Sequence, residues 1–299
     1  MATLRSNFAD LFLADARPVL DSVIFDELEK YPDFMPKIFR MYSSDTWGDQ
    51  TTTATGLPAA GQKLEGENVE FGSPIQGYDK TYTFSTYSTA VAFSEELVED
   101  NRTNLVEDSY RSLGLSIYQT VQVTGFNVLN NGFTDTGPDG VSLLNTAHPL
   151  IGGGTYANRP SPEVALSVAG MREMETDMMR QVNDRSINVM LVPLKLIVPP
   201  ELSFVAKELV KSQYKPLTGN NEINTLFGNY DVIVSPFLTS TTAWFAQSDV
   251  SQTQMRFYNR VAPSTRTWYD EKSGTVNTRI RCRFDVGYSN YPGVWGTTG

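Results

Sequence analysis

The sequence predicts an α+β fold in which a long helix packs against long antiparallel strands and a smaller α/β unit follows. Three patterns favour this fold class: a helical period that persists over residues 104–131, two strands at 265–270 and 275–285 joined by a turn, and alternating helix and strand signals at 161–250. The chain has 299 residues, 40% of them hydrophobic, so it can bury a sizeable core without disulfides.

The first half of the chain contains two amphipathic helices and one strand pattern. The spacing of apolar residues predicts a short helix at 19–31 and a long helix at 104–131, which is about 40 Å long at 1.5 Å per residue. Gly114 and Gly125 lie inside the long helix and indicate close crossings or a bend. Alternating aromatic and β-branched residues at 78–93 predict a strand.

The α/β signals begin after a loop rich in glycine and asparagine. Ser161, Pro162 and Glu163 provide the N-cap, the first-turn proline and the early acid of a helix start. The methionines between 171 and 190 are expected to fill the core of this unit. Its further elements are a buried strand at 189–198, a helix at 200–211 and a second apolar strand at 230–236.

Residues 48–77 are rich in Thr, Gly and Pro and have no helical period. So long a segment is unusual inside a compact domain, so it is either disordered or an extended loop that packs against something else. The charged residues Lys63, Glu65 and Glu67 alternate with apolar residues, as in one strand of a hairpin. We therefore favour an extended loop.

Arg279, Arg281 and Arg283 are spaced two apart, which places all three on one face of a strand, with Ile280 and Cys282 on the other face. Like charges repel unless something acidic covers them, and the plain alternative is a solvated face. Our hypothesis is that the loop of a neighbouring copy covers them through Glu65, Glu67 and Glu70.

Composition excludes several kinds of chemistry. With one histidine and one cysteine, the chain cannot form an internal disulfide, a Cys/His zinc site or an iron–sulfur cluster, and we expect no metal site and no cofactor. A net charge of −10 argues against a protein that binds nucleic acid by neutralising phosphates. The charge is uneven, at −11 over residues 1–110 and +4 over residues 251–299, which would suit head-to-tail contacts between copies. The longest apolar run, 187–200, is too short and too interrupted for a membrane helix.

His148 is the candidate residue for an enzymatic function. As the only histidine it could serve as a general base, but the sequence contains no Gly-X-Ser-X-Gly nucleophile elbow, and adjacent acidic pairs such as Glu95 and Glu96 lack the spacing of a calcium loop. Gly152 to Gly154 are not followed by the Lys-Ser or Lys-Thr of a phosphate-binding loop. We therefore expect no catalytic residues, and a loop hydrogen bond is the expected role of His148.

The order of these parts resembles a known family, the major capsid proteins of tailed phages with the Hong Kong 97 type fold, and within it the Mu-like major head subunit group. Each matching motif is weak alone, but together they extend in one order over about 200 residues. The motifs are Glu65-Gly66-Glu67, the strand at 78–83, Phe93-Ser94-Glu95-Glu96-Leu97, the helix end at 128–133, LNTAHPL at 144–150, LIVPPEL at 196–202 and SPFLT at 235–239.

The resemblance implies a domain organisation, and it adds Lys63 in the extended loop and Glu271 and Lys272 at the hairpin tip to the expected subunit interface. The expected parts are an N-terminal arm at 1–47, an extended loop (E-loop) at 48–77, a peripheral (P) domain at 78–160 with the long helix as its spine, an axial (A) domain at 161–250, P-domain strands at 251–286 with a hairpin tip at 270–274, and a return to the A domain at 287–299.

The resemblance also implies a structural function without catalysis. Many copies would form pentamers and hexamers in a closed icosahedral shell that encloses double-stranded DNA without binding it specifically. The expected partners are further copies of the chain, a separate scaffolding protein, a portal and possible decoration proteins, with no membrane. The expected location is the virion, after assembly in the host cytoplasm. Two alternatives remain open: an encapsulin-like cage with enzyme cargo, and a soluble α/β enzyme that uses His148.

Overall fold

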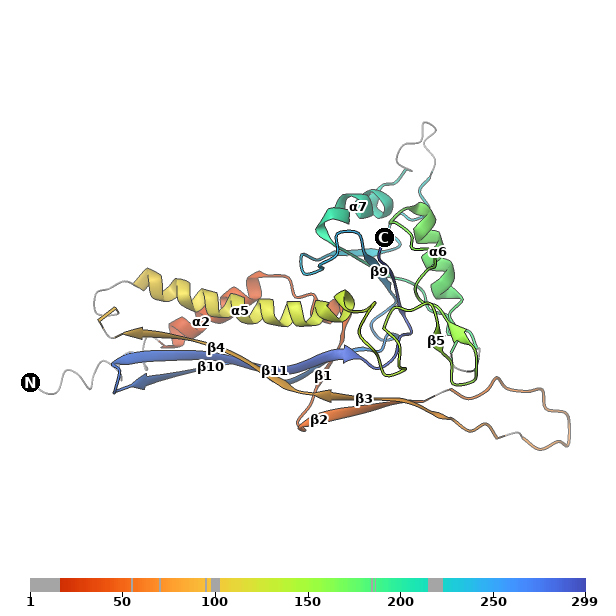
Figure 1. Ribbon diagram of the computed structural model, residues 1–299, viewed down its shortest axis with the longest axis horizontal. Helices are drawn as coiled ribbons and strands as arrows, with labels where there is room; N and C mark the ends of the chain where they lie inside the picture. Colours follow the sequence, from red (N-terminus) through yellow and green to blue (C-terminus); the bar gives the residue numbers. More distant parts are fainter. Residues whose placement is uncertain are drawn as a thin grey trace, which may run out of the picture.

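The protein is elongated, with a long helix above a long twisted sheet, a compact second unit at one end and a projecting loop (Figure 1). This computed structural model describes residues 17–54, 56–69, 71–94, 96–97, 103–183, 185, 187–214 and 223–299. The α+β class predicted from the sequence is confirmed. Among the described residues, no helix combines the length and the apolar character needed to cross a bilayer.

The elements of the elongated body come from both ends of the chain. The helices are α2 (Arg17–Lys30), α3 (Met35–Ile38) and α5 (Thr103–Asn130). The strands are β1 (Arg40–Ser43), β2 (Gly48–Ala54), β3 (Gln76–Thr83), β4 (Ser85–Ser94), β10 (Met255–Asp270) and β11 (Thr275–Tyr288).

The second unit is built from the residues between α5 and β10 and from the C-terminal strand. Its helices are α6 (Val168–Met179), the short 3₁₀ helix η2 (Pro200–Leu202) and α7 (Ser203–Lys211). Its strands are β5 (His148–Pro149), β6 (Thr155–Tyr156), β7 (Lys195–Val198), β8 (Asp231–Val234), β9 (Trp244–Gln247) and β12 (Val294–Thr297).

The body is a four-stranded sheet in the order β1-β10-β11-β4, covered on one face by α5. Alternation along β11 directs Ile280, Cys282 and Phe284 toward the helix, where all three are buried. The helix contributes Tyr110 and Ile117 to the same core. The long helix and the β10–β11 hairpin are thus confirmed, because each has a continuous apolar face to bury.

The N-terminal helices pack against α5 at its two glycines. A Cβ at Gly114 would lie 2.8 Å from the carbonyl oxygen of Ile24 in α2, and a Cβ at Gly125 would lie 2.2 Å from the Met35 sulfur in α3. The absence of a side chain lets both helices approach the α5 backbone closely. Close crossings are therefore the reason for these glycines.

The second unit contains a sheet in the order β12-β9-β7-β8 that is buried on both faces. Along β7, Leu196 and Val198 face a core shared with α6 and α7, while Ile197 faces the core shared with α5. Trp244 and Trp295 lie side by side in the first of these cores, with ring centroids 4.9 Å apart. The sheet therefore joins the second unit to the body.

Three expected elements differ in the structure. The helix expected from Ser161 is wrong, because α6 begins at Val168 with Ser167 as its N-cap, whose Oγ accepts from the Gly170 N–H at 3.2 Å. The buried strand expected at 189–198 is formed only by β7, and the preceding residues are partly exposed and irregular. The strand expected at 78–93 is divided into β3 and β4, which pair with different partners.

Residues 48–77 form a hairpin base and a loop. β2 and β3 pair from Gly48 with Thr83 to Ala54 with Gln76. The described residues between the strands, 56–69 and 71–75, form no strand and are called the exposed loop below. The half-hairpin expected around Lys63 is therefore wrong: the chain makes a turn there and has no partner strand.

Candidate interaction surfaces

The exposed loop is a surface that its own chain leaves uncovered. Every described residue in it is exposed, including its large apolar side chains, and Phe71 reaches 96% exposure. The other exposed apolar residues of the loop are Leu57, Leu64, Val69 and Ile75. Near the base, Arg185 Nη2 donates to the carbonyl oxygen of Ser73 at 2.6 Å. Apolar side chains gathered on a protruding loop are typical of a protein interaction site.

The predicted charged residues of the loop lie at its tip. The N–H of Glu67 donates to the carbonyl oxygen of Leu64 at 3.2 Å, and Gly66 between them has φ +84°, as the third position of a type II turn requires. The described members of the predicted set are all exposed: Lys63, Glu65 and Glu67. Glu70 lies outside the described residues.

The arginine row, Arg279, Arg281 and Arg283, lies on the face of β11 opposite α5, as its spacing predicts. Arg266 of β10 pairs in register with Arg279 and adds a further cation to this face. None of the row forms an ion pair with a carboxylate in the described part of the chain. Arg279 Nε is buried without a hydrogen-bond partner there, whereas Arg283 Nε donates to the carbonyl oxygen of Phe84 at 3.3 Å. The row therefore has no acidic cover from the described residues of its own chain.

Glu271 and Lys272 form the exposed tip of the β10–β11 hairpin. Asp270 orders this turn, because its carboxylate accepts from the Lys272 N–H at 3.0 Å and from the Ser273 hydroxyl at 2.9 Å. The hairpin tip and the exposed loop lie at opposite ends of the long axis (Figure 1). The exposed loop therefore projects away from the hairpin tip of its own chain.

His148 is a buried structural residue. Its ring is 0% exposed and stacks on Tyr291, with ring centroids 3.9 Å apart. Its Nδ1 lies 2.6 Å from the Asp139 carboxylate, and its Nε2 lies 2.9 Å from Asn158 Oδ1. Asn158 Nδ2 donates to the carbonyl oxygens of Leu143 and Val294, which fixes the amide orientation, so both histidine nitrogens face acceptors. These contacts hold the loop after α5 against the C-terminal strand and leave no nitrogen for a substrate.

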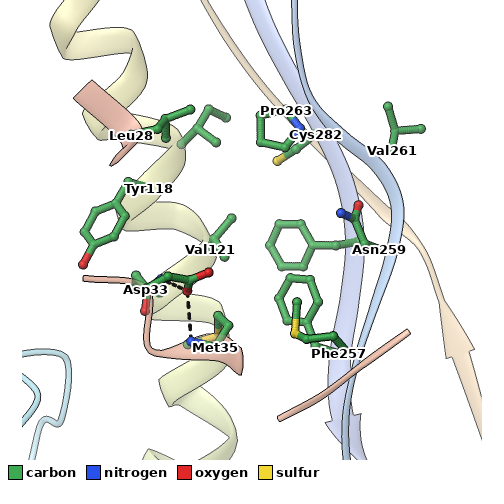
Figure 2. Close-up of a pocket in the computed structure, with 14 residues that line it drawn as sticks. Leu28, Asp33, Met35, Tyr118, Val121, Phe257, Asn259, Val261, Pro263 and Cys282 are labelled. Atoms are coloured by element: carbon green, nitrogen blue, oxygen red, sulfur yellow. Dashed lines mark hydrogen bonds between the residues drawn. The ribbon is translucent and has the colours of Figure 1, made fainter. Parts of the chain in front are cut away.

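A cavity of about 230 Å³ lies between the long helix and the sheet. Leu28, Tyr118 and Val121 line it on the helical side and Cys282 on the strand side (Figure 2). Gln122 also lines it, and although its Nε2 donates to Asp33, its buried Oε1 has no hydrogen-bond partner among the described residues.

The cavity affects the chemistry of the single cysteine. Burial raises the pKa of the Cys282 thiol to about 11, so the thiol stays protonated and unreactive at neutral pH. The described residues contain no group of three or more His, Cys, Asp or Glu side chains that could hold a metal ion.

Sequence reasoning did not find Phe71, Gln122 or the cavity. The signal for Phe71 was present, since a phenylalanine in a polar, glycine-rich segment has no local core to join. Gln122 gave no signal, because a single glutamine in a helix is ordinarily solvated. The cavity depends on how α2, α5 and β10 pack, which no single segment encodes.

A family model described as "Phage capsid protein" matches residues 77–295. This match covers the long helix, the second unit and the β10–β11 hairpin, and stops short of the exposed loop. No curated protein matches the sequence.

Solved structures share the fold at low sequence identity. The capsid of Ralstonia phage GP4 is 11% identical, with a TM-score of 0.59 over 87% of this chain and 86% of that one. The capsid of bacteriophage JBD30 decorated with minor capsid protein trimers is 14% identical, with a TM-score of 0.57 over 70% and 92%. A virus-like particle from Pyrococcus furiosus is 10% identical, with a TM-score of 0.55 over 94% and 98%.

Proposed function

The chain belongs to the phage capsid protein family and is a structural subunit of a capsid, not an enzyme. On this premise, we propose how its copies associate. They form pentamers and hexamers that close into an icosahedral shell. The observation that carries this proposal is the exposed loop, whose large apolar side chains are exposed to solvent in the single chain. A subunit with a projecting loop at one end and a complementary surface elsewhere makes head-to-tail contacts, which close into rings when the rotation permits.

The domain assignment implied by the resemblance is part of the proposal. Residues 1–47 act as the arm, 48–77 as the loop over a neighbour, 78–160 with 251–286 as the P domain, and 161–250 with 287–299 as the A domain around the ring axis. The sheet that contains β7, β9 and β12 supports this division, because the C-terminal strand completes the second unit. The Mu-like subgroup stays a prediction.

The contact between neighbours is electrostatic in part. We place Glu65, Glu67 and Glu70 of one copy against the arginine row of the next, with Lys63 and the hairpin-tip residues Glu271 and Lys272 at further contacts. The support is the half-buried row, which has no carboxylate partner among the described residues, and the exposed acids Glu65 and Glu67 at the loop tip. Charge complementarity of this kind fixes the register and partner choice more than it adds affinity.

The shell is a virion component that encloses double-stranded DNA. The net charge of −10 supports enclosure without tight binding, since DNA affinity comes from clustered cations. A scaffolding protein, a portal and decoration proteins are the further partners, with assembly in the host cytoplasm. The JBD30 structures include a procapsid and a capsid decorated with minor capsid protein trimers, so this fold supports both kinds of particle there.

The alternative cage is less favoured. The virus-like particle from Pyrococcus furiosus shares the fold, so structural similarity alone does not separate an encapsulin-like cage from a phage head. The family match favours the head. Neighbouring genes for a portal and a terminase would decide for it as well.

Electron microscopy of the purified protein tests the proposal. We expect closed shells from the wild-type chain and folded, unassembled subunits from the variant with Arg279, Arg281 and Arg283 all changed to Glu. The matched control changes the same residues to Lys, keeps the charge and should still assemble. Changing Glu65, Glu67 and Glu70 to Arg in the reversed chain should restore shells. Normal shells from the reversed variant would rule out the arginine contact. A wild-type chain that forms shells neither alone nor with its scaffolding protein would rule out the proposed function.

A further inference from the structure

The most exposed large apolar side chain and the cavity between helix and sheet have complementary properties. Phe71 is 96% exposed, more than any other large hydrophobic residue that the structure describes. The cavity is mostly apolar, with Val121, Phe257 and Cys282 among its lining residues. Water finds few hydrogen-bond partners in an apolar cavity. A cavity of about 150 Å³ lined by aliphatic and aromatic side chains is large enough to bind benzene. At about 230 Å³, this cavity can therefore hold a benzyl group.

The cavity is accessible from the side on which the sheet is incomplete. β1 pairs with β10 only as far as Asn259, and the ladder between β10 and β11 is irregular between Asn259 and Ser264. Val261 and Pro263 of this irregular stretch line the cavity, as does Met41, which is 43% exposed. Beyond β1, no described strand covers this edge of β10. A chain that approaches the edge therefore meets the opening directly.

We propose that Phe71 of one copy inserts into this cavity of a neighbouring copy and anchors the exposed loop there. The inference rests on the proposed assembly, because the loop points away from the helix and sheet of its own chain (Figure 1).

The anchor and the arginine contact are compatible. Cys282 lies between Arg281 and Arg283 in β11 with its side chain on the opposite face, so both contacts use one short stretch of this strand. Glu67 and Phe71 are four residues apart, a span of about 13 Å in an extended chain. Neighbouring strands are about 4.8 Å apart, so this span passes around the edge of β10. One loop can place its acids on the arginine face and Phe71 on the helix face.

Thiol crosslinking in mixed shells tests the proposal. A minority of copies with Phe71→Cys is assembled with an excess of wild-type copies, which supply the native Cys282. The shells are then oxidised at alkaline pH, because burial raises the pKa of the Cys282 thiol to about 11. We expect covalent dimers that a reductant dissociates. Phe71→Cys with an excess of Cys282→Ser copies should give none, and Leu64→Cys with wild-type copies serves as the position control and should give few.

A second thiol pair covers a separation too large for a direct disulfide. Phe71→Cys copies are assembled with copies that carry Met41→Cys and Cys282→Ser, so the second thiol lies at the cavity opening. Dimers from either pair support the anchor. Shells that contain Phe71→Cys copies but give dimers with neither partner would overturn it and leave the proposed assembly intact. Failure of the wild-type chain to form shells would instead contradict the proposed function.

Discussion

Glu163 has a different role in the structure from the one that its local sequence predicts. Its position after a serine and a proline predicts the first turn of a helix. In the structure its carboxylate accepts from the Thr297 hydroxyl at 2.5 Å, from the Thr298 N–H at 2.9 Å and from Arg159 Nε at 2.5 Å. The contacts with Thr297 and Thr298 join residues 134 and 135 positions apart, so local sequence could not reveal them. The glutamate holds the C-terminal strand instead of starting a helix.

The same contacts make the second unit sensitive to acid. Partial burial raises the pKa of Glu163, but the hydrogen bonds from Thr297, Thr298 and Arg159 outweigh it and leave the pKa below its usual 4.5. The contribution of Glu163 to the free energy of unfolding is thus fully present above pH 4.5, and it is lost as the pH falls through the lowered pKa of this carboxyl. We expect Glu163→Gln to lower the free energy of unfolding at pH 7 by about 1 kcal/mol and to have a smaller effect at pH 3. Denaturant unfolding of the unassembled subunit measures both values, and an equal effect at the two pH values would contradict the argument.

Helices and strands were predictable where one apolar face is buried along their whole length. The period of α5 and the alternation of β11 encode their burial directly, and both elements have almost the expected bounds. The apolar residues before β7 predict a buried strand, but Val192 and Leu194 are 47% and 41% exposed. These two side chains therefore do not lie in a core of this chain. Such exposed apolar residues are available to a neighbouring copy. The hydrophobic pattern of a sequence does not distinguish residues for such a contact from residues of the chain's own core.

The two glycines of α5 should respond differently to alanine. At Gly114 the new Cβ would meet the backbone carbonyl oxygen of Ile24, so α2 must move, whereas at Gly125 it would meet the flexible end of Met35. We expect Gly114→Ala to lower the free energy of unfolding by about 1–3 kcal/mol. For Gly125→Ala the change should stay within about 1 kcal/mol, because methionine adapts and alanine favours the helix. Thermal unfolding of the two variants compares them, and a more damaging Gly125→Ala would show that α3 controls the packing.

At the scale of the whole molecule, the sequence predicted which residues form the interaction surfaces better than it predicted where these surfaces lie relative to one another. The face of the arginine row followed from spacing alone, since period-two alternation is a local property. Alternation misled at the loop acids, which lie in a turn and not in a strand. The location of the acids and the row in different parts of an elongated subunit did not follow, because it depends on how α5 and the sheet set the direction of the β2–β3 hairpin (Figure 1). The cavity also belongs to this scale, as several elements form it together.

The exposed loop should be dispensable for folding and required for assembly. Ala54 and Gln76 are paired in register, so residues 55–75 can be replaced by Asn-Gly, which favours a two-residue hairpin turn. Because every described residue at 56–76 is exposed, this deletion removes no core contact, and the melting temperature of the unassembled subunit should change by no more than a few degrees. Shells should be absent from electron micrographs and from sedimentation profiles.

A same-length loop with Phe71 retained and Leu57, Val69 and Ile75 changed to Ser serves as the control, and it should assemble if the anchor and the acids suffice. Shells formed by the deleted chain would show that copies associate through other surfaces, and the loop would then have no part in assembly.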